Sequence, residues 1–317
     1  MRIGIDIMGG DYAPEETIKG ALLSLKEFDS EDKLILLGDE QTIKAKIEEN
    51  SREFKDIDDS LYEIVHTSEV IDMGENQLRA IAHKQDSSIV RGLQMVDNKE
   101  LDGFGSVGNT GALFVGALQI VKNIPNVTRP AIFTFIPKEA GKYGILIDAG
   151  ANADCKPENL KQFGILGSIY ASELLEMSNP KVGLMNIGEE KTKGNMLSQS
   201  AFVLLNEEKQ INFVGNIEGR DLFNEKADIV VCDGFTGNIA LKVAESIVNL
   251  LQKEEDIASH LERFDFVNYG GTPILGINSP ILVGHGISNA KAIYNMIEST
   301  KKIIKTNLFE KLKVAFN

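Results

Sequence analysis

The chain has 317 residues, and its 47 Asp and Glu residues outnumber its 33 Lys and Arg residues, which gives a formal net charge of −14. Such an acidic chain does not hold nucleic acid or anionic lipid through its bulk charge. Hydrophobic residues make up 43% of the sequence, enough for a sizeable core, so a chain disordered throughout is excluded.

The two cysteines, Cys155 and Cys232, lie far apart and form no CxxC motif. This argues against a disulfide scaffold and against a zinc site, and it fits a reducing compartment. The N-terminus has no signal-peptide pattern, and no run reaches about 18 apolar residues. We therefore expect a cytoplasmic protein without a membrane span.

Short apolar runs alternate with helix-length amphipathic segments along the chain. The expected strands are residues 3–7, 34–37, 63–66, 104–107, 131–136, 145–149, 181–187, 212–214 and 229–232. The expected helices are residues 15–28, 76–94, 111–122, 158–175, 196–207, 238–253 and 290–302. This alternation predicts a mainly parallel sheet flanked by helices. Open sheets of this kind bind ligands in the loops after the carboxyl ends of their strands.

Polar, glycine-bearing loops follow most of the expected strands. The first contains Gly9, Gly10 and Asp11 just before a helix, where free backbone N–H groups favour an anion and Asp11 is a candidate helix cap. The second contains Gly108, Asn109, Thr110 and Gly111, whose amide and hydroxyl groups are candidate donors to an oxyanion.

Later loops repeat these residue types. The loop at 148–158 carries Asp148, Asn152 and Lys156, and the loop at 233–238 carries Asp233 and Asn238. Similar loops lie at 186–190, 268–271 and 284–289, and the last holds His285 between two glycines, which makes it the histidine with the strongest case for function. The repeated placement predicts an enzyme with an anionic ligand. No HExxH, GxSxG, GxGxxG or P-loop motif is present.

Eight ordered motifs along the chain resemble the PlsX family, the bacterial acyl-(acyl carrier protein):phosphate acyltransferases. They are residues 5–11 (IDIMGGD), 108–112 (GNTGA), 129–130 (RP), 148–152 (DAGAN), 186–188 (NIG), 233–238 (DGFTGN), 268–271 (NYGG) and 285–286 (HG). The resemblance implies transfer of a long-chain acyl group from acyl carrier protein to inorganic phosphate. The acyl phosphate product would feed phosphatidic acid synthesis through a glycerol-3-phosphate acyltransferase.

The resemblance also implies a three-layer α/β/α fold like that of the isocitrate and isopropylmalate dehydrogenases and the phosphotransacetylases. It implies a homodimer loosely attached to the inner face of the cell membrane. We expect no cofactor and no metal. We expect one catalytic domain over residues 1–317, with a helical dimerisation segment near 241–267 and a C-terminal amphipathic helix near 298–317.

Two positions depart from the family pattern. Ala82 stands where relatives carry Arg before the pair Ser87 and Ser88, and His83 or Lys84 are the candidates to replace it. The segment 242–267 is shorter than the apolar hairpin of many relatives, and its acidic centre at 253–256 suits an anionic lipid surface poorly. The basic segment 301–317 is a second candidate for a membrane or an acidic partner; the alternative is a terminal helix packed on its own domain.

For this reaction we expect the Gly9–Gly10 turn, with Asp11, and the loop Gly108, Asn109, Thr110 and Gly111 to hold phosphate and the oxyanion. We expect Lys156 to supply a cation, Asn152 and Asn238 to orient ligand oxygens, and His285 to donate to the leaving sulfur. Asp148 and Asp233 are expected to order their loops. Residues 122–161, with six basic against four acidic residues, are a candidate dock for the acidic carrier protein.

Three other functions compete with this interpretation. The first is a phosphotransacetylase-type enzyme that uses acyl-CoA. The second is a nicotinamide-dependent decarboxylating dehydrogenase of related fold, which would need a metal-binding Asp cluster. The third is a non-catalytic membrane-surface scaffold that acts through the C-terminal helix.

Overall fold

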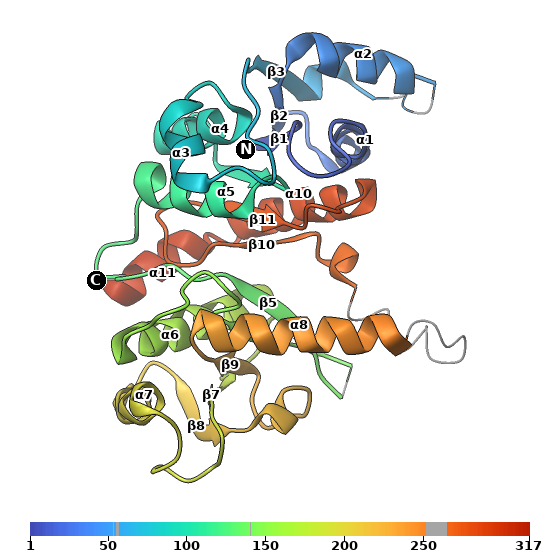
Figure 1. The fold of residues 1–317 in the computed structure, drawn as a ribbon. Helices are drawn as coiled ribbons and strands as arrows, with labels where there is room; N and C mark the ends of the chain where they lie inside the picture. Colours follow the sequence, from blue (N-terminus) through green and yellow to red (C-terminus); the bar gives the residue numbers. More distant parts are fainter. Residues whose placement is uncertain (53, 55–56, 140, 252–264) are drawn as a thin grey trace. The chain divides into compact units, whose positions relative to one another are not determined.

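The computed structural model describes residues 1–317 except 53, 55–56, 140 and 252–264. The chain divides into two compact units (Figure 1). The first contains Met1–Asn123 and Phe266–Phe309, and the second contains Ile124–Asp265 and Glu310–Asn317. Because the expectation of a single catalytic domain concerns how these units act together, it stays a prediction.

The first unit is built on a six-stranded sheet in the order β10-β11-β4-β1-β2-β3. Its strands are β1 (Arg2–Asp6), β2 (Lys33–Gly38), β3 (Tyr62–His66), β4 (Gly103–Ser106), β10 (Gly271–Pro273) and β11 (Ile281–Gly284). All neighbouring pairs are parallel except β10 with β11. Ile3 and Ile5 of β1 and Leu34 and Leu36 of β2 are fully buried, as central parallel strands require.

The helices of the first unit are α1 (Glu15–Ser24), α2 (Glu40–Asn50), α3 (Gln77–His83), α4 (Ser88–Asp97), α5 (Thr110–Gly116) and α10 (Ala290–Lys305). A π-helical turn, Ala117–Val121, extends α5. Helix α1 packs closely on α10, because a Cβ built on Gly20 would lie 2.4 Å from the Cβ of Ile293.

The second unit has a five-stranded sheet in the order β5-β6-β9-β7-β8, in which only β5 is antiparallel to its neighbour. Its strands are β5 (Phe133–Pro137), β6 (Tyr143–Ile147), β7 (Lys181–Met185), β8 (Asn212–Ile217) and β9 (Ile229–Val231). Its helices are α6 (Pro157–Leu174), α7 (Met196–Glu207) and α8 (Gly234–Leu251). The last helix of the chain, α11 (Leu308–Phe316), begins in the first unit and ends in the second.

The predicted α/β class with mainly parallel pairing is confirmed, but the strands form two sheets. The sequence did not indicate β10, β11 or α2. The helix expected at 76–94 is two helices, because the chain turns at 84–87 and the Ser87 hydroxyl caps α4 by accepting from the Val90 N–H (3.4 Å).

The C-terminal amphipathic segment is also two helices, separated at Asn307, whose φ is 52°. Its apolar face is covered, since Leu308, Phe309 and Leu312 are buried. The Lys301 ammonium is buried as well and lies 4.7 Å from the centre of the Phe28 ring. These contacts favour the packed terminal helix over a face left free for a membrane.

The expected dimerisation segment near 241–267 begins in the last part of α8, but about half of it, with its acidic centre at 253–256, falls on residues 252–264, outside the described residues. Among the residues that the structure describes, no helix is both long and apolar enough to cross a membrane.

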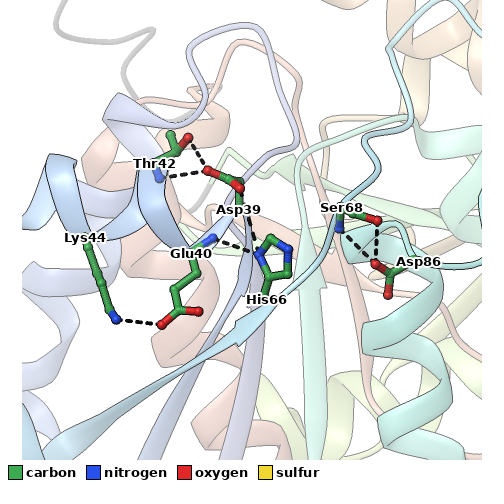
Figure 2. A network of polar contacts seen from close by, with 7 residues as sticks. All are labelled: Asp39, Glu40, Thr42, Lys44, His66, Ser68 and Asp86. Carbon is green, nitrogen blue, oxygen red and sulfur yellow. Dashed lines mark hydrogen bonds and ion pairs between the residues drawn. The ribbon is translucent and has the colours of Figure 1, made fainter.

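Polar side chains order the loops at the carboxyl ends of the strands (Figure 2). His66, at the end of β3, accepts a hydrogen bond through Nδ1 from the Glu40 N–H (3.1 Å) at the start of α2. Asp39 caps the same helix by accepting from the Thr42 N–H (2.8 Å). These bonds give the exposed His66 a structural role.

Candidate active site

Three loops of the first unit meet at one sheet edge and form what we call the glycine cradle, residues 8–12, 107–111 and 284–288. They follow β1, β4 and β11, which are neighbours in the sheet. The Asp11 N–H donates to the Gly286 carbonyl (2.7 Å), and a Cβ built on Gly9 would lie 2.8 Å from the Gly108 backbone. Gly10 has a φ of +97°, which a side chain would strain.

Asp6 is the centre of this cradle. Its carboxylate is buried and accepts from the Met8 N–H (3.0 Å) and from the Ser106 hydroxyl (2.7 Å). The same hydroxyl accepts from the Gly108 N–H (3.0 Å), so Asp6 joins the loop after β1 to the loop after β4. Burial raises the pKa of Asp6, while hydrogen bonds from Ser88 and Ser106 act in the opposite direction.

Asp6 belongs to the motif at residues 5–11, but no role was predicted for it. A carboxylate at the end of an apolar strand and directly before two glycines was the available signal.

The start of α5 leaves hydrogen-bond donors available. Asn109 is the N-cap, and its Oδ1 accepts from the Ala112 N–H (2.9 Å). The N–H groups of Thr110 and Gly111 have no acceptor within the described part of the chain. Thr110 is exposed, so these donors can meet a ligand oxygen.

The Asn109 amide group donates its hydrogen bonds within the protein. Its Nδ2 donates to the carbonyls of Asp72 (3.0 Å), Met73 (3.1 Å) and Glu75 (3.1 Å), and the side chain is buried. In this arrangement Asn109 fixes the loop at 72–75. The geometry favours a positioning role over the expected donation to an oxyanion.

Two other expectations for the first unit meet different surroundings. Asp11 is exposed and does not cap α1, whose N-cap is Pro14 without a side-chain hydrogen bond, so the capping prediction is wrong. His285 is exposed, and its ring lies 4.5 Å from the Phe266 ring, tilted by 31°. The nearby start of α10 is occupied by the chain itself, because Glu16 accepts from the Ala290 N–H (2.7 Å).

The family departure on α3 also has a structural setting. Ala82 and His83 are exposed, whereas Lys84 pairs with Glu75 and donates to the Val70 carbonyl (2.5 Å). Because the Lys84 ammonium is already bound to Glu75 and Val70, His83 is the remaining candidate to replace the arginine.

In the second unit, Asp148 organises the loop after β6. It accepts five hydrogen bonds, from the N–H groups of Ile132, Gly150, Ala151 and Asn152 and from the Asn152 amide. Burial raises the pKa of Asp148, and these hydrogen bonds act against the shift. All five bonds shape the loop.

The start of α8 lies against this loop. The Gly234 N–H donates to the Asn152 carbonyl (2.8 Å), and a Cβ on Gly237 would lie 1.9 Å from the Asp148 carbonyl oxygen. This close approach explains the two glycines of the DGFTG motif. Asp233 accepts from the N–H (2.8 Å) and hydroxyl (3.0 Å) of Thr236, and so orders the first turn.

The remaining candidate residues of the second unit differ in exposure and in hydrogen bonding. Asn152 is buried and also donates to the Pro130 carbonyl (2.8 Å). Asn238 is exposed, lies against Gly150 and donates weakly to the Ala149 carbonyl (3.4 Å). Lys156, the residue before α6, is exposed, and its ammonium has no partner among the residues described.

Cys155 lies in the same loop but is poorly suited to act as a nucleophile. Its thiol contacts the Asn152 carbonyl (3.5 Å), and burial, together with the charge of Asp148, raises its pKa to about 11. The thiol therefore stays protonated near neutral pH.

Solved structures identify the fold class. A phosphotransacetylase from Streptococcus pyogenes matches 98% of this chain and 94% of its own with a TM-score of 0.64, at 17% identity. The fold is that of the phosphotransacetylases, as predicted. At this identity the likeness concerns the fold alone.

Sequence comparison identifies the family. A family model described as "Fatty acid synthesis protein" matches residues 1–311. The phosphate acyltransferase of Halothermothrix orenii is 42% identical over 100% of this chain and 99% of its own. That of Dictyoglomus turgidum is 40% identical over 100% of this chain and 98% of its own. The chain belongs to this family of phosphate acyltransferases, which confirms the resemblance to PlsX.

Proposed function

We propose that this protein transfers a fatty acyl group from acyl carrier protein to inorganic phosphate and so forms an acyl phosphate. The observation that carries the proposal is the family membership over the whole chain. The relatives' names support phosphate as the acceptor, and the family description supports a fatty acyl group. The carrier protein, the role in phospholipid synthesis, the homodimer and a place at the inner membrane face are parts of the same proposal.

The proposed reaction needs no nucleophilic side chain, because phosphate itself is the nucleophile. A phosphate oxygen attacks the thioester carbonyl carbon, and the carbon–sulfur bond of the resulting tetrahedral intermediate breaks. The thiolate leaves easily because a thiol has a pKa of about 8.5. The protein has to hold phosphate beside the thioester and stabilise the oxyanion.

We assign these tasks to groups on the loops described above. In the first unit, the N–H groups of Thr110 and Gly111 in the glycine cradle are the proposed donors to anionic oxygen, and His285 is the proposed proton donor to sulfur. In the second unit, Lys156 is the proposed cation and Asn238 the proposed amide that orients a ligand oxygen. Asp6, Asp148 and Asp233 keep the loops in place.

The test mixes purified protein with palmitoyl-acyl carrier protein and inorganic phosphate, and detects acyl phosphate by hydroxylamine trapping and mass spectrometry. We expect product that depends on phosphate. Lys156→Ala should lower kcat/KM at least about tenfold, whereas Lys209→Ala, which removes another exposed lysine of the second unit, should not. Near-normal turnover in Lys156→Ala would remove that residue from the proposal.

The same assay with palmitoyl-CoA separates the main alternative. Product from the CoA thioester alone would favour the phosphotransacetylase-type activity, which the fold also accommodates. No product from either donor would contradict the acyltransfer itself.

A further inference from the structure

We propose that Met73 contacts the acyl chain of the donor and that Asn109 positions it there. This inference rests on the proposed function, since it assigns the acyl-binding surface of the same reaction. Met73 lies on the loop from Ser68 to Asn76, between β3 and α3, to which the established motifs give no role.

The first observation is an apolar rim on the glycine cradle. Tyr12, Met73 and Ile287 expose 53%, 43% and 51% of their surface, and all three lie on the cradle loops or against them. A Cβ built on Gly286 would lie 2.6 Å from the Met73 Cε and 3.6 Å from an Asp11 carboxylate oxygen. The Met73 methyl group therefore rests on the main chain of the cradle, where Tyr12 follows Asp11 and Ile287 follows Gly286.

The second observation is that the loop carrying Met73 is firmly held. The buried Asn109 amide donates to three of its carbonyls, those of residues 72, 73 and 75. The Asp72 N–H donates to the Glu75 carboxylate (2.9 Å), which also pairs with Lys84. At the start of the loop, the Ser68 N–H (2.9 Å) and hydroxyl (2.7 Å) donate to Asp86 (Figure 2).

These contacts keep an apolar side chain at the surface instead of letting it fold inward. The N–H groups of Thr110 and Gly111, which follow Asn109 in the chain, have no acceptor among the described residues and can donate to a polar group of a ligand. A ligand that satisfies both features has a polar acyl carbonyl or phosphate at one end and a hydrocarbon chain at the other, as an acyl thioester has. Methionine suits such a ligand because its flexible thioether adapts to chains of different shape.

The experiment compares octanoyl, lauroyl and palmitoyl donors on acyl carrier protein, with kcat and KM measured separately for donor and phosphate. Met73→Gln keeps the length of the side chain but makes its end polar. We expect it to raise the KM for the palmitoyl donor about tenfold, with a smaller effect on shorter donors and an unchanged KM for phosphate. Met196→Gln, at a methionine 88% exposed in the second unit, is the matched control and should leave the profile unchanged.

Asn109→Asp tests the positioning role. The variant keeps the Oδ1 that caps α5 but replaces the two N–H donors with an acceptor facing three carbonyls. We expect the same loss of preference for long chains as in Met73→Gln. If Asn109 donated to the oxyanion directly, kcat would instead fall equally for all donors. Because this buried substitution could also unfold the unit, the surface variant Met73→Gln decides the proposal independently.

The outcomes separate this inference from the proposed function. Acyl phosphate formation with an unchanged chain-length profile in Met73→Gln would overturn the inference and leave the function standing. A change in sedimentation of Met73→Gln with the same profile would also overturn it, since the rim would then bind a second copy of the chain. No acyl phosphate from any donor in the wild-type protein would overturn both.

Discussion

At the scale of single residues, burial decides which charged groups can act. Lys138 was one of the basic residues of the expected dock at 122–161, but it is only 3% exposed and donates through Nζ to the Leu222 carbonyl (2.8 Å). It therefore contributes no accessible charge for a partner. Burial lowers the pKa of Lys138 to about 8, although the charges of Asp228 and Glu225 act to raise it.

The Lys138 shift predicts a pH dependence of stability. The folded-state pKa of about 8 lies below the ordinary value of 10.5, so the unfolded chain binds the proton more tightly between these values. The free energy of unfolding should rise with pH across this window, by about 2 kcal/mol between about pH 7.5 and pH 9.5. Urea unfolding of wild type and Lys138→Met at both pH values measures it. An equal pH dependence in the two proteins would contradict the shift.

At the scale of elements, the loops after β1 and β4 work as one because Asp6 and Ser106 join them. The glycines on both sides let the two backbones touch. Gly9 in particular has no room for a side chain, since its Cβ would lie 2.3 Å from the Asp6 carboxylate. The two loops are thus joined by a buried carboxylate and by two glycines, Gly9 and Gly108, in the loops after different strands.

Substitution at Gly9 should therefore destabilise the first unit. We expect Gly9→Ala to lower the free energy of unfolding by about 1–3 kcal/mol, because the methyl group must displace Asp6 or the Gly108 backbone. Gly74→Ala is the matched control in the same unit, since nothing lies within 4 Å of a Cβ built there. Urea unfolding of both variants checks this. Equal free energies of unfolding for the two variants would contradict the prediction, because the cradle would then accommodate the methyl group without loss of stability.

At the scale of the whole molecule, the net charge of the chain affects which acyl donor the protein can bind. The chain carries a net charge of −14, so an acidic carrier protein is repelled except where a local basic surface receives it. Lys138 is buried and Lys161 pairs with Glu208 (3.5 Å), so the exposed cations of the expected dock include Lys122 and Lys156.

A basic docking surface predicts that the KM for the carrier-bound acyl donor depends on the salt concentration. Raising the salt concentration from about 50 mM to about 500 mM should increase the KM for palmitoyl-acyl carrier protein severalfold, because the shorter Debye length screens the attraction. Palmitoyl-pantetheine, which has the same thioester without the charged carrier, is the control and should show little change. A KM for the carrier-bound donor that does not respond to salt would exclude the dock.

The sequence alone determined the fold class, the positions of the polar loops and the family of this protein. Alternating strand and helix patterns are local, so they predicted the mainly parallel α/β class. The residue types after each strand predicted the loops at 8–12, 107–111, 148–158 and 233–238. Ordered motifs predicted the family, because they do not depend on how the loops are packed.

Only the tertiary structure decided which of those polar residues are available. Asn109 and Lys156 look equally suited to catalysis in the sequence, yet the Asn109 amide is bound to three carbonyls of a distant loop and Lys156 is exposed. The amphipathic face of 301–317 is covered by packing, and the strands separate into two sheets. The physical reason is the same in each case. Hydrogen bonding and burial depend on neighbours far along the chain, and a local pattern does not specify them.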